Sequence, residues 1–362
     1  MRIKTRQKNS GIAIMIVLVA IFFLSALAFN FATSMKVEMK LAAAANYEPE
    51  LEWGGRSGIE LARYVLGQQL TIPNTPYDSL NQKWAGGPGS TNDGVLTDIS
   101  LTDVPLGDGK FSVKIIDSER KFNINAALAN PTILQHALTL MGADAGNIDT
   151  IVASIQDWID LDDQIHVNGA ESEYYQTLNP PYFAKNGPID DLTELLLVKG
   201  ITPELYWGPN SANHPPSMFQ GHPDARAQLQ ASQQMLPVGL VDVFTPISTG
   251  RINLNTASVA TLQMIPGIDQ NMAGEIIRMR SGPDGVDGTE DDTPLRQPGG
   301  QDLINIGLSP VAAQQISTFC DVRSSTFEVQ VDVQIGLISR RYFALLRRLS
   351  NRDVQILTMR WE

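Results

Sequence analysis

The longest apolar run of the chain lies near its N-terminus and starts directly after a short basic segment. The first eleven residues, MRIKTRQKNSG, carry four basic side chains, and no charged residue follows from Ile12 to Met35. These 24 uncharged residues would form a helix about 36 Å long at about 1.5 Å per residue, enough to cross the hydrocarbon core of a bilayer. The positive-inside bias then keeps the basic segment in the cytoplasm.

Three interpretations fit this N-terminal pattern. A cleaved signal peptide has the same basic start, and small residues around 26–28 offer a cleavage site, but the pattern continues without a break through residues 31–53. A plain membrane anchor is the second interpretation. The third, which we favour, is a type IV prepilin leader that a dedicated peptidase cuts on the cytoplasmic side, between Gly11 and Ile12.

Residues 36–68 predict a further helical stretch. Pro49 lacks a backbone donor and the pair Gly54-Gly55 follows it, so we expect this helix to be kinked or interrupted there. After this point one helical face is apolar and can pack on a sheet; its members are Ile59, Leu61, Ala62, Val65 and Leu66. Residues 69–108 are rich in Gly, Pro, Asn and Asp and predict a loop with one short strand.

Strand patterns enclose a long helical region. Alternating side chains over 111–116 predict a strand, and three consecutive antiparallel strands are predicted to start at Phe327, Ser339 and Asp353. The pattern therefore predicts an α+β fold, in which an antiparallel sheet is interrupted by a large α-helical insert. The predicted parts are a leader (1–11), a transmembrane helix (12–35), a stalk helix with the first part of the sheet domain (36–124), the inserted α-helical domain (125–322) and the C-terminal strands (323–362).

Two segments of the insert resemble helix-hairpin-helix or SAM-like units. In residues 252–280 we expect Asn255 to cap a helix that begins at Thr256, and IPGI to form the turn before a second helix. The other unit turns at Gly200. In DNA-binding versions, backbone amides and basic residues hold a phosphate, whereas here Asp269 follows the turn. We expect structural packing; the alternative is a membrane-tethered nucleic-acid-binding protein of a DNA-uptake system.

Taken together in their order and spacing, several stretches resemble one family, the minor pseudopilin K of type II secretion systems, also called general secretion pathway protein K. The resemblance covers nearly the whole chain, including a pilin-like sheet with an α-rich insert. The stretches are NSGIAIMIVL, RSGIELARYVL, ERKFNINAA, DWIDLDDQIHVNGAESEYY, DLTELLLVKGITPELY and RINLNTASVATLQMIPGI.

This resemblance implies a non-enzymatic subunit at the tip of the secretion pseudopilus, anchored in the inner membrane with its C-terminal domain in the periplasm. Pilins usually carry a glutamate as the fifth residue after cleavage, where it meets the amine of the preceding subunit; here that residue is Ile16. A carboxylate inside a membrane costs about 2.5 to 3.5 kcal/mol on insertion scales, and in pilins the amine of the preceding subunit offsets that cost. A subunit that enters first has no preceding subunit and therefore needs no carboxylate at this position. Implied partners are minor pseudopilins I and J, the inner-membrane assembly platform, prepilin peptidase, the secretin and exoprotein cargo.

The formal net charge of −12 opposes binding to a phosphate backbone, so no nucleic-acid partner is expected, and it leaves room for divalent cations. Two acidic clusters are candidate calcium sites, because carboxylate oxygens are ligands that calcium prefers. The resemblance to pseudopilin K implies calcium binding in the α-rich domain and so supports both candidates. The alternatives are a solvated helix end for the first cluster and an ordinary acidic loop for the second. The candidate ligands are Asp160, Asp162, Asp163 and Glu171 in the first cluster, and Asp284, Asp287, Asp291 and Asp292 in the second.

Catalytic motifs are missing from the sequence. It has no HExxH, GxSxG, P-loop or CxxC pattern, and its single cysteine, Cys320, is expected to be a buried thiol in a helix. His166 lies beside the first acidic cluster and leaves open a mixed transition-metal site, although an ordinary loop histidine is the simpler interpretation. Arginines gather in the C-terminal strands, where they form either a solvated sheet face or a docking surface.

Overall fold

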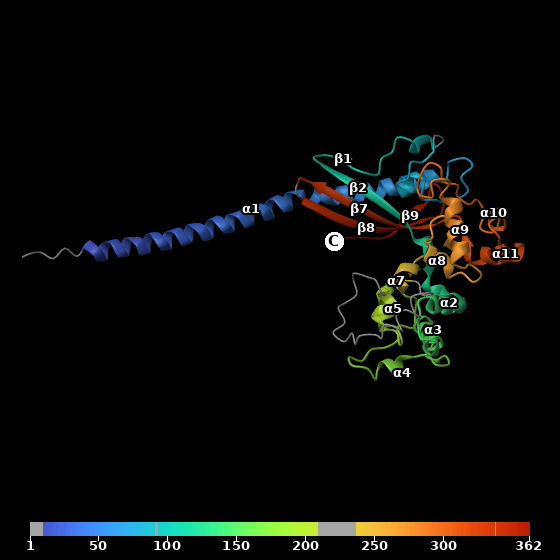
Figure 1. Cartoon of the computed structure of the whole chain (residues 1–362). Coiled ribbons are helices and arrows are strands. Elements are labelled where there is room, and N and C mark those ends of the chain that lie inside the picture. The colour runs from blue at the N-terminus through green and yellow to red at the C-terminus, as the bar shows by residue number, and fades with distance from the viewer. Residues whose placement is uncertain (1–9, 91–92, 209–236, 337) are drawn as a thin grey trace, which may run out of the picture.

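The computed structural model describes residues 10–90, 93–208, 237–336 and 338–362. A single helix of 60 residues, α1 (Ser10–Gln69), dominates the shape (Figure 1). Its first half projects alone, and its second half lies along a sheet. The predicted interruption near Pro49 and Gly54-Gly55 was wrong, because α1 runs through all three residues.

The glycines of α1 serve close packing instead of ending the helix. A Cβ atom at Gly54 or Gly55 would lie 2.6 Å from the nearest side-chain atom of Val333 or Tyr342, and one at Gly58 would overlap Val331. The helix therefore approaches the sheet more closely than any side chain at these positions would permit. On the same side, Ile59, Ala62, Val65 and Leu66 are fully buried and Leu61 packs at the margin, which confirms the predicted apolar face.

The sheet has five strands in the order β1-β2-β7-β8-β9, and all neighbours are antiparallel. The three predicted C-terminal strands are confirmed. The bounds are Val104–Leu106 for β1, Gly109–Asp117 for β2, Thr326–Ile335 for β7, Ile338–Arg348 for β8 and Val354–Trp361 for β9. The central pair β2 and β7 is separated in sequence by the whole helical insert, which confirms the predicted topology of an interrupted sheet.

The loop before the sheet contains η1 (Lys83–Ala85) and η2 (Gly94–Leu96), with β1 as its one short strand. Trp84 of η1 is fully buried, and its ring meets that of Phe327 edge to face with centroids 5.3 Å apart. One aromatic side chain thus fixes this Gly- and Pro-rich segment on the sheet.

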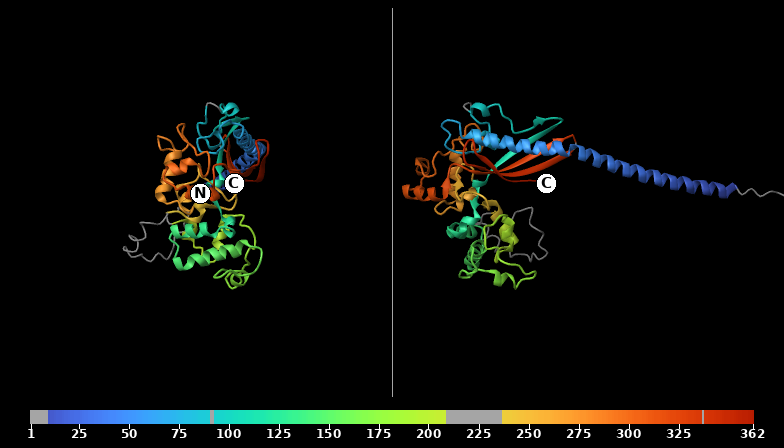
Figure 2. Two further views of the ribbon diagram at one scale, coloured as in Figure 1. Left: turned by 90° about the vertical axis from the view of Figure 1, so that its right-hand side faces the viewer. Right: turned by 180° about the vertical axis from the view of Figure 1, so that it is seen from behind.

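The insert between β2 and β7 is a set of short helices. In Figures 1 and 2, α8 to α11 lie beyond the end of the sheet that is far from the free half of α1, and α2 to α5 lie beside the sheet. The longer helices are α2 (Pro131–Leu140), α3 (Ala145–Ile159), α9 (Gln270–Arg280) and α11 (Pro310–Phe319). The shorter elements are η3 (Ser118–Arg120), η4 (Ile124–Leu128), α4 (Ser172–Tyr175), η5 (Leu192–Leu197), α5 (Pro203–Trp207), α7 (Leu240–Val243), α8 (Val259–Gln263) and α10 (Gln301–Asn305).

Two pairs of very short parallel strands, β3 (Phe122–Asn123) with β4 (Phe244–Thr245) and β5 (Ile252–Asn253) with β6 (Cys320–Asp321), tie the insert together. Cys320 is fully buried as expected, and burial raises the pKa of its thiol. The prediction that Cys320 lies in a helix was wrong, because α11 ends at Phe319 and Cys320 is the first residue of β6.

The described residues form two separate hydrophobic cores, one between α1 and the sheet and one inside the insert. A buried polar joint connects them at Asp117, the last residue of β2. Its Oδ2 atom accepts hydrogen bonds from Asn253 and Thr256 of the insert and from Ser324, which precedes β7. Burial and the neighbouring Glu119 charge raise the pKa of Asp117 to about 8. This network fixes how the insert leaves and re-enters the sheet.

Candidate metal centre

Asp157 lies in the last turn of α3 and is fully buried. Its Oδ1 atom accepts a hydrogen bond from the His166 backbone amide at 2.9 Å, and its Oδ2 atom accepts one from the Ala170 amide at 2.7 Å. The ring Nδ1 atom of His166 lies 2.5 Å from Oδ1. A Cβ atom at Gly169 would overlap Oδ2. Asp157 therefore folds the loop 160–170 around its own carboxylate.

Several buried oxygens beside this loop have no hydrogen-bond partner. They are Oδ1 of Asp160, both carboxylate oxygens of Glu171, and Oδ1 of Asn186. Asn186 is held by its amide nitrogen, which donates to the Asp162 carbonyl at 3.0 Å and to Asp163 Oδ1 at 2.8 Å. Buried oxygens without donors are costly unless a cation or water meets them, and oxygens of this type are the ligands that calcium prefers.

The electrostatics of the loop favour a cation. Burial, followed by the charges of Asp157 and Asp160, raises the pKa of Glu171 to about 7. The pKa of Asp160 is also raised, by burial and by the neighbouring charges of Asp162 and Asp157. A divalent cation here would offset this repulsion and favour the ionised carboxylates.

The four residues of the first predicted cluster lie in or next to one loop, but the surroundings of their carboxylates differ. Asp160 and Glu171 carry unpartnered buried oxygens, whereas Asp162 and Asp163 are exposed and accept hydrogen bonds from the Gln164 amide and from Asn186. Within the described ranges, one group of at least three His, Cys, Asp or Glu ligand atoms lies within a mutual 4.8 Å: Asp157, Asp160 and His166. The assignment of individual ligands stays a prediction.

Sequence reasoning missed Asp157 and Asn186. Asp157 was detectable in principle, as a carboxylate that replaces an apolar residue on the buried face of a helix. No local signal marks Asn186, which lies in a separate loop and enters the site only through the tertiary fold.

The second predicted cluster is organised by a basic residue. The guanidinium of Arg280, at the end of α9, pairs with both Asp287 oxygens at 3.0 and 2.6 Å and donates to the carbonyls of Leu254 and Ala257. The carboxylates of Asp284, Asp291 and Asp292 accept hydrogen bonds from backbone amides within the loop. Arg280 thus supplies a neutralising charge that sequence reasoning had expected from a metal, and the calcium assignment here stays a prediction.

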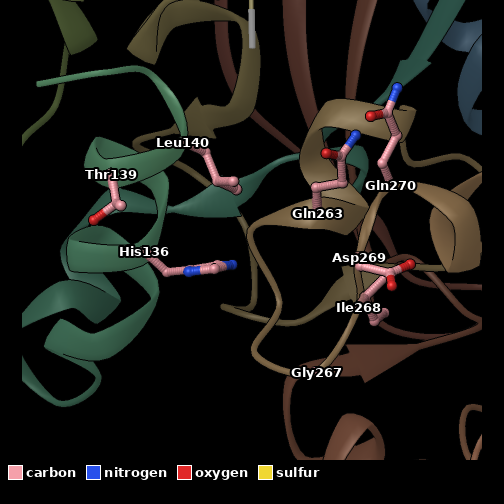
Figure 3. Close-up of a pocket in the computed structure, with 8 residues that line it drawn as sticks. All are labelled: His136, Thr139, Leu140, Gln263, Gly267, Ile268, Asp269 and Gln270. Atoms are coloured by element: carbon pink, nitrogen blue, oxygen red, sulfur yellow. The ribbon is translucent and has the colours of Figure 1, made fainter. Parts of the chain in front are cut away.

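The helix-hairpin-helix turn faces α2, and Figure 3 shows the intervening pocket. Gly267 forms the turn with φ +94°, and the side chain of Asp269 accepts a hydrogen bond from the Met272 amide at the start of α9. A carboxylate thus occupies the helix N-terminus at which a phosphate would bind. The predicted cap on the preceding helix was wrong: Ser258 caps α8, and Asn255 instead exchanges two hydrogen bonds with Leu295.

Comparisons with known proteins match several of these parts. The family model for type II secretion system protein K matches residues 120–207, and the helix-hairpin-helix motif model matches 248–287. Proteins described as type II secretion system protein K are 30% identical over 213 residues in Escherichia coli K12 and 29% identical over 205 residues in Klebsiella pneumoniae. Each of these alignments covers 55% of this chain and 60% of the relative.

The chain is thus similar to type II secretion system protein K over just over half of its length. A solved GspK-GspI-GspJ complex from the type 2 secretion system of enterotoxigenic Escherichia coli contains a chain of similar fold, with a TM-score of 0.58 and 18% identity. The match covers 89% of this chain and 99% of that one. The two chains therefore share an α+β fold, which in this chain has an apolar N-terminal helix, an antiparallel sheet and a helical insert with a helix-hairpin-helix motif.

The apolar part of α1 spans Ile14–Met39, and none of it is buried by the rest of the chain. It is the one candidate membrane span among the described residues. Ile16 lies within it and is 64% exposed. Gly11 and Ile12 lie in the first turn of α1, and residues 1–9 of the predicted leader lie outside the described ranges.

Proposed function

We propose that this protein is a minor pseudopilin that caps the tip of the type II secretion pseudopilus, helps to start its assembly and supports protein export. The observation that carries the proposal is the position of the insert. Its helices α8 to α11 lie beyond the end of the sheet opposite the free half of α1 (Figure 2). A subunit stacked on that end would meet the insert before it met the sheet.

GspI- and GspJ-type minor pseudopilins are the proposed neighbours below this subunit. The solved protein of similar fold is in a complex with GspI and GspJ, which supports this choice. The long exposed anchor of α1 supplies a helix for such contacts in the inner membrane, and the sheet and insert would then lie in the periplasm.

Processing at the N-terminus completes the proposal. Prepilin peptidase would cut between Gly11 and Ile12, which places Ile16 fifth in the mature chain. Because this position carries no carboxylate, the subunit has no need of a preceding subunit's amine to offset a charge in the membrane. We therefore expect this subunit to enter the pseudopilus first.

The loop 160–170 is the proposed calcium site of this subunit. Asp160, Glu171 and Asn186 would hold the ion, because each carries a buried oxygen without a hydrogen-bond partner. Calcium supplies positive charge that offsets the repulsion among the carboxylates and thereby orders the loop. The substitution Glu171→Gln should weaken calcium binding measured by calorimetry, whereas Glu173→Gln, at an exposed position, should not.

Three measurements test the tip assignment. Mass analysis of the membrane form should find a chain starting at Ile12 only when prepilin peptidase is present. Gold labelling of the insert should mark one end of assembled pseudopili, and labels along their length would contradict a capping role. Secretion and filament number should fall when Ile16→Glu introduces a carboxylate into the membrane span, with Ile16→Leu as the matched control. Equal secretion by the two variants would remove the argument from Ile16.

A further inference from the structure

A pocket lined by three arginines lies where α1, the sheet and the insert meet. It has a volume of about 370 Å³, and its walls come from the loop after α1, the end of β8, and the segments next to β5 and β6. The arginines are Arg251, Arg323 and Arg348, and we call this cavity the arginine pocket. Three positive charges at one cavity contrast with the formal net charge of −12 of the whole chain.

The buried arginine of the pocket is already paired. Arg348 is 4% exposed and donates to Asp78 and to the carbonyls of Ser324 and Leu66. The carboxylate of Asp78 therefore neutralises Arg348, whose guanidinium forms a fixed part of the pocket wall. The charge that is available to a ligand comes from the two outer arginines, Arg251 and Arg323.

The two outer arginines have little counter-charge. The Nη1 atom of Arg251 lies 3.5 Å from Oδ2 of Asp321, a long contact for an ion pair. The guanidinium of Arg323 donates through Nε to the Pro76 carbonyl at 2.8 Å, and among the described residues it forms no ion pair. Its two Nη groups are therefore held in place with no acceptor in the described part of the chain.

Two further carboxylates lie behind the pocket wall, and both are buried. Glu119 accepts hydrogen bonds from the Thr249 amide and the Ser325 hydroxyl, and both donors belong to residues of the wall. Burial and the Glu119 charge raise the pKa of Asp117 to about 8, so Asp117 is mostly protonated at neutral pH and adds little negative charge. At the exposed mouth of the pocket, two guanidinium groups thus face the single carboxylate of Asp321.

The free donors of the pocket fit a carboxylate. Planar guanidinium groups bind carboxylates through two parallel N–H bonds, and Arg323 has both Nη groups available. Thr249 lines the same pocket, and its hydroxyl adds a donor. Leu349 also lines it and is 55% exposed, so apolar contact there favours a carboxylate carried by a peptide over a small inorganic anion.

We propose that the arginine pocket binds the side-chain carboxylate of an acidic peptide segment from a partner protein. The carboxylate would lie between Arg251 and Arg323, and an apolar side chain beside it in the peptide would cover Leu349. Because Arg251 precedes β5 of the insert and Arg323 precedes β7 of the sheet, the bound peptide would link the two parts of the fold. This inference does not depend on the position of the subunit in a pseudopilus.

The first test is protection from phenylglyoxal, a reagent that modifies guanidinium groups, in the full chain in detergent. The probe is the peptide acetyl-leucyl-glutamyl-leucinamide, and the corresponding glutamine peptide is the matched control. The glutamate peptide should slow modification of Arg251 and Arg323 about tenfold by mass spectrometry, because the bound carboxylate occupies their N–H groups. Arg360 of β9, whose side chain is 72% exposed, should be modified at the same rate throughout.

Inorganic phosphate separates a peptide site from a general anion site. Phosphate should protect Arg251 and Arg323 less than the glutamate peptide does, because phosphate gains nothing from apolar contact with Leu349. Equal protection by phosphate and by the glutamate peptide would overturn the assignment to a peptide. Equal protection by the glutamate and glutamine peptides, or protection by neither, would overturn the carboxylate site itself.

Substitutions provide the second test. Arg323→Gln and Arg323→Lys should each abolish the protection of Arg251, because neither new side chain forms a two-point contact with a carboxylate. Arg360→Gln is the matched control and should keep that protection. Thermal unfolding identifies a variant that has lost its fold; in that case Arg251→Gln, which loses one long contact with Asp321, should abolish the protection of Arg323. Full protection in the folded variants would overturn the proposal.

Discussion

The carboxylate of Asp78 and the guanidinium of Arg348 form an ion pair in which both side chains are at most 2% exposed. The pair joins the loop after α1 to the end of β8. Arg348 also donates to the carbonyls of Ser324 and Leu66, and Asp78 accepts from the Ser324 amide. The pair thus connects α1, β8 and the point where the insert returns to the sheet.

Removing one member of this pair should destabilise the whole fold. Asp78→Asn leaves a buried guanidinium without its counter-charge, and such changes cost about 3 to 5 kcal/mol. The exposed pair of Asp332 and Arg341 gives the control, because Asp332→Asn should cost less than about 1 kcal/mol. Denaturant unfolding of the detergent-solubilised chain measures both values. Equal losses in the free energy of unfolding for the two variants would contradict a larger contribution of the buried pair to stability.

Glycine at position 58 should be required for helix–sheet packing. In Gly58→Ala the new Cβ atom would overlap the Val331 side chain, and overpacking of this kind costs about 1 to 3 kcal/mol. Gly274 in α9 is the control, because an added Cβ atom there would have no neighbour within 4 Å, and alanine should stabilise that helix by about 0.5 to 1 kcal/mol. The added change Val331→Ala should partly rescue Gly58→Ala, and absence of any rescue would contradict this contact as the cause.

The response to calcium should depend on pH through Glu171. Its pKa is raised from 4.5 to about 7, so between these values the folded state holds a proton that the unfolded state has released. Without calcium, the free energy of unfolding therefore falls as pH rises from about 4.5 to about 7. Calcium competes with that proton, and we expect its increase of the melting temperature to be larger at pH 8 than at pH 5.

The matched variants for this prediction are Glu171→Gln and Glu173→Gln. The first should remove most of the pH dependence of the calcium response, and the second should keep it. Asp117, whose pKa is raised to about 8, adds a decrease in stability with rising pH that does not involve calcium. The difference between melting curves with and without calcium cancels that contribution. A calcium response that is equal at both pH values would contradict the role of Glu171.

The second acidic loop should depend on Arg280 even without calcium. Asp287→Asn removes the charge that meets the nearly buried guanidinium, and hydrogen bonds to charged groups contribute about 1.5 to 3 kcal/mol each. The exposed Asp284 accepts only from the Val286 amide among the hydrogen bonds described, so Asp284→Asn should cost less. Thermal unfolding in the presence of a chelator measures both. A loss for Asp287→Asn that appears only with calcium present would favour a metal role for this loop.

The sequence by itself determined the features that depend on local period and composition. The apolar run from Ile12, the alternation from Phe327 onward and the helical face from Ile59 to Leu66 each predicted the correct element, because burial of one face leaves a periodic record in the chain. The acidic residues around Asp160 likewise predicted a candidate cation site in the loop that carries the unpartnered oxygens.

Only the tertiary structure decided features that depend on residues distant in sequence. Gly54 and Gly55 suggested a helix break locally, but they meet β7 and β8 near the other end of the chain, where a missing Cβ atom permits close packing. Arg280 neutralises Asp287, and Asn186 reaches the loop of Asp160 from a separate segment. These contacts leave no periodic record, because each depends on one side chain that the completed fold brings to its partner.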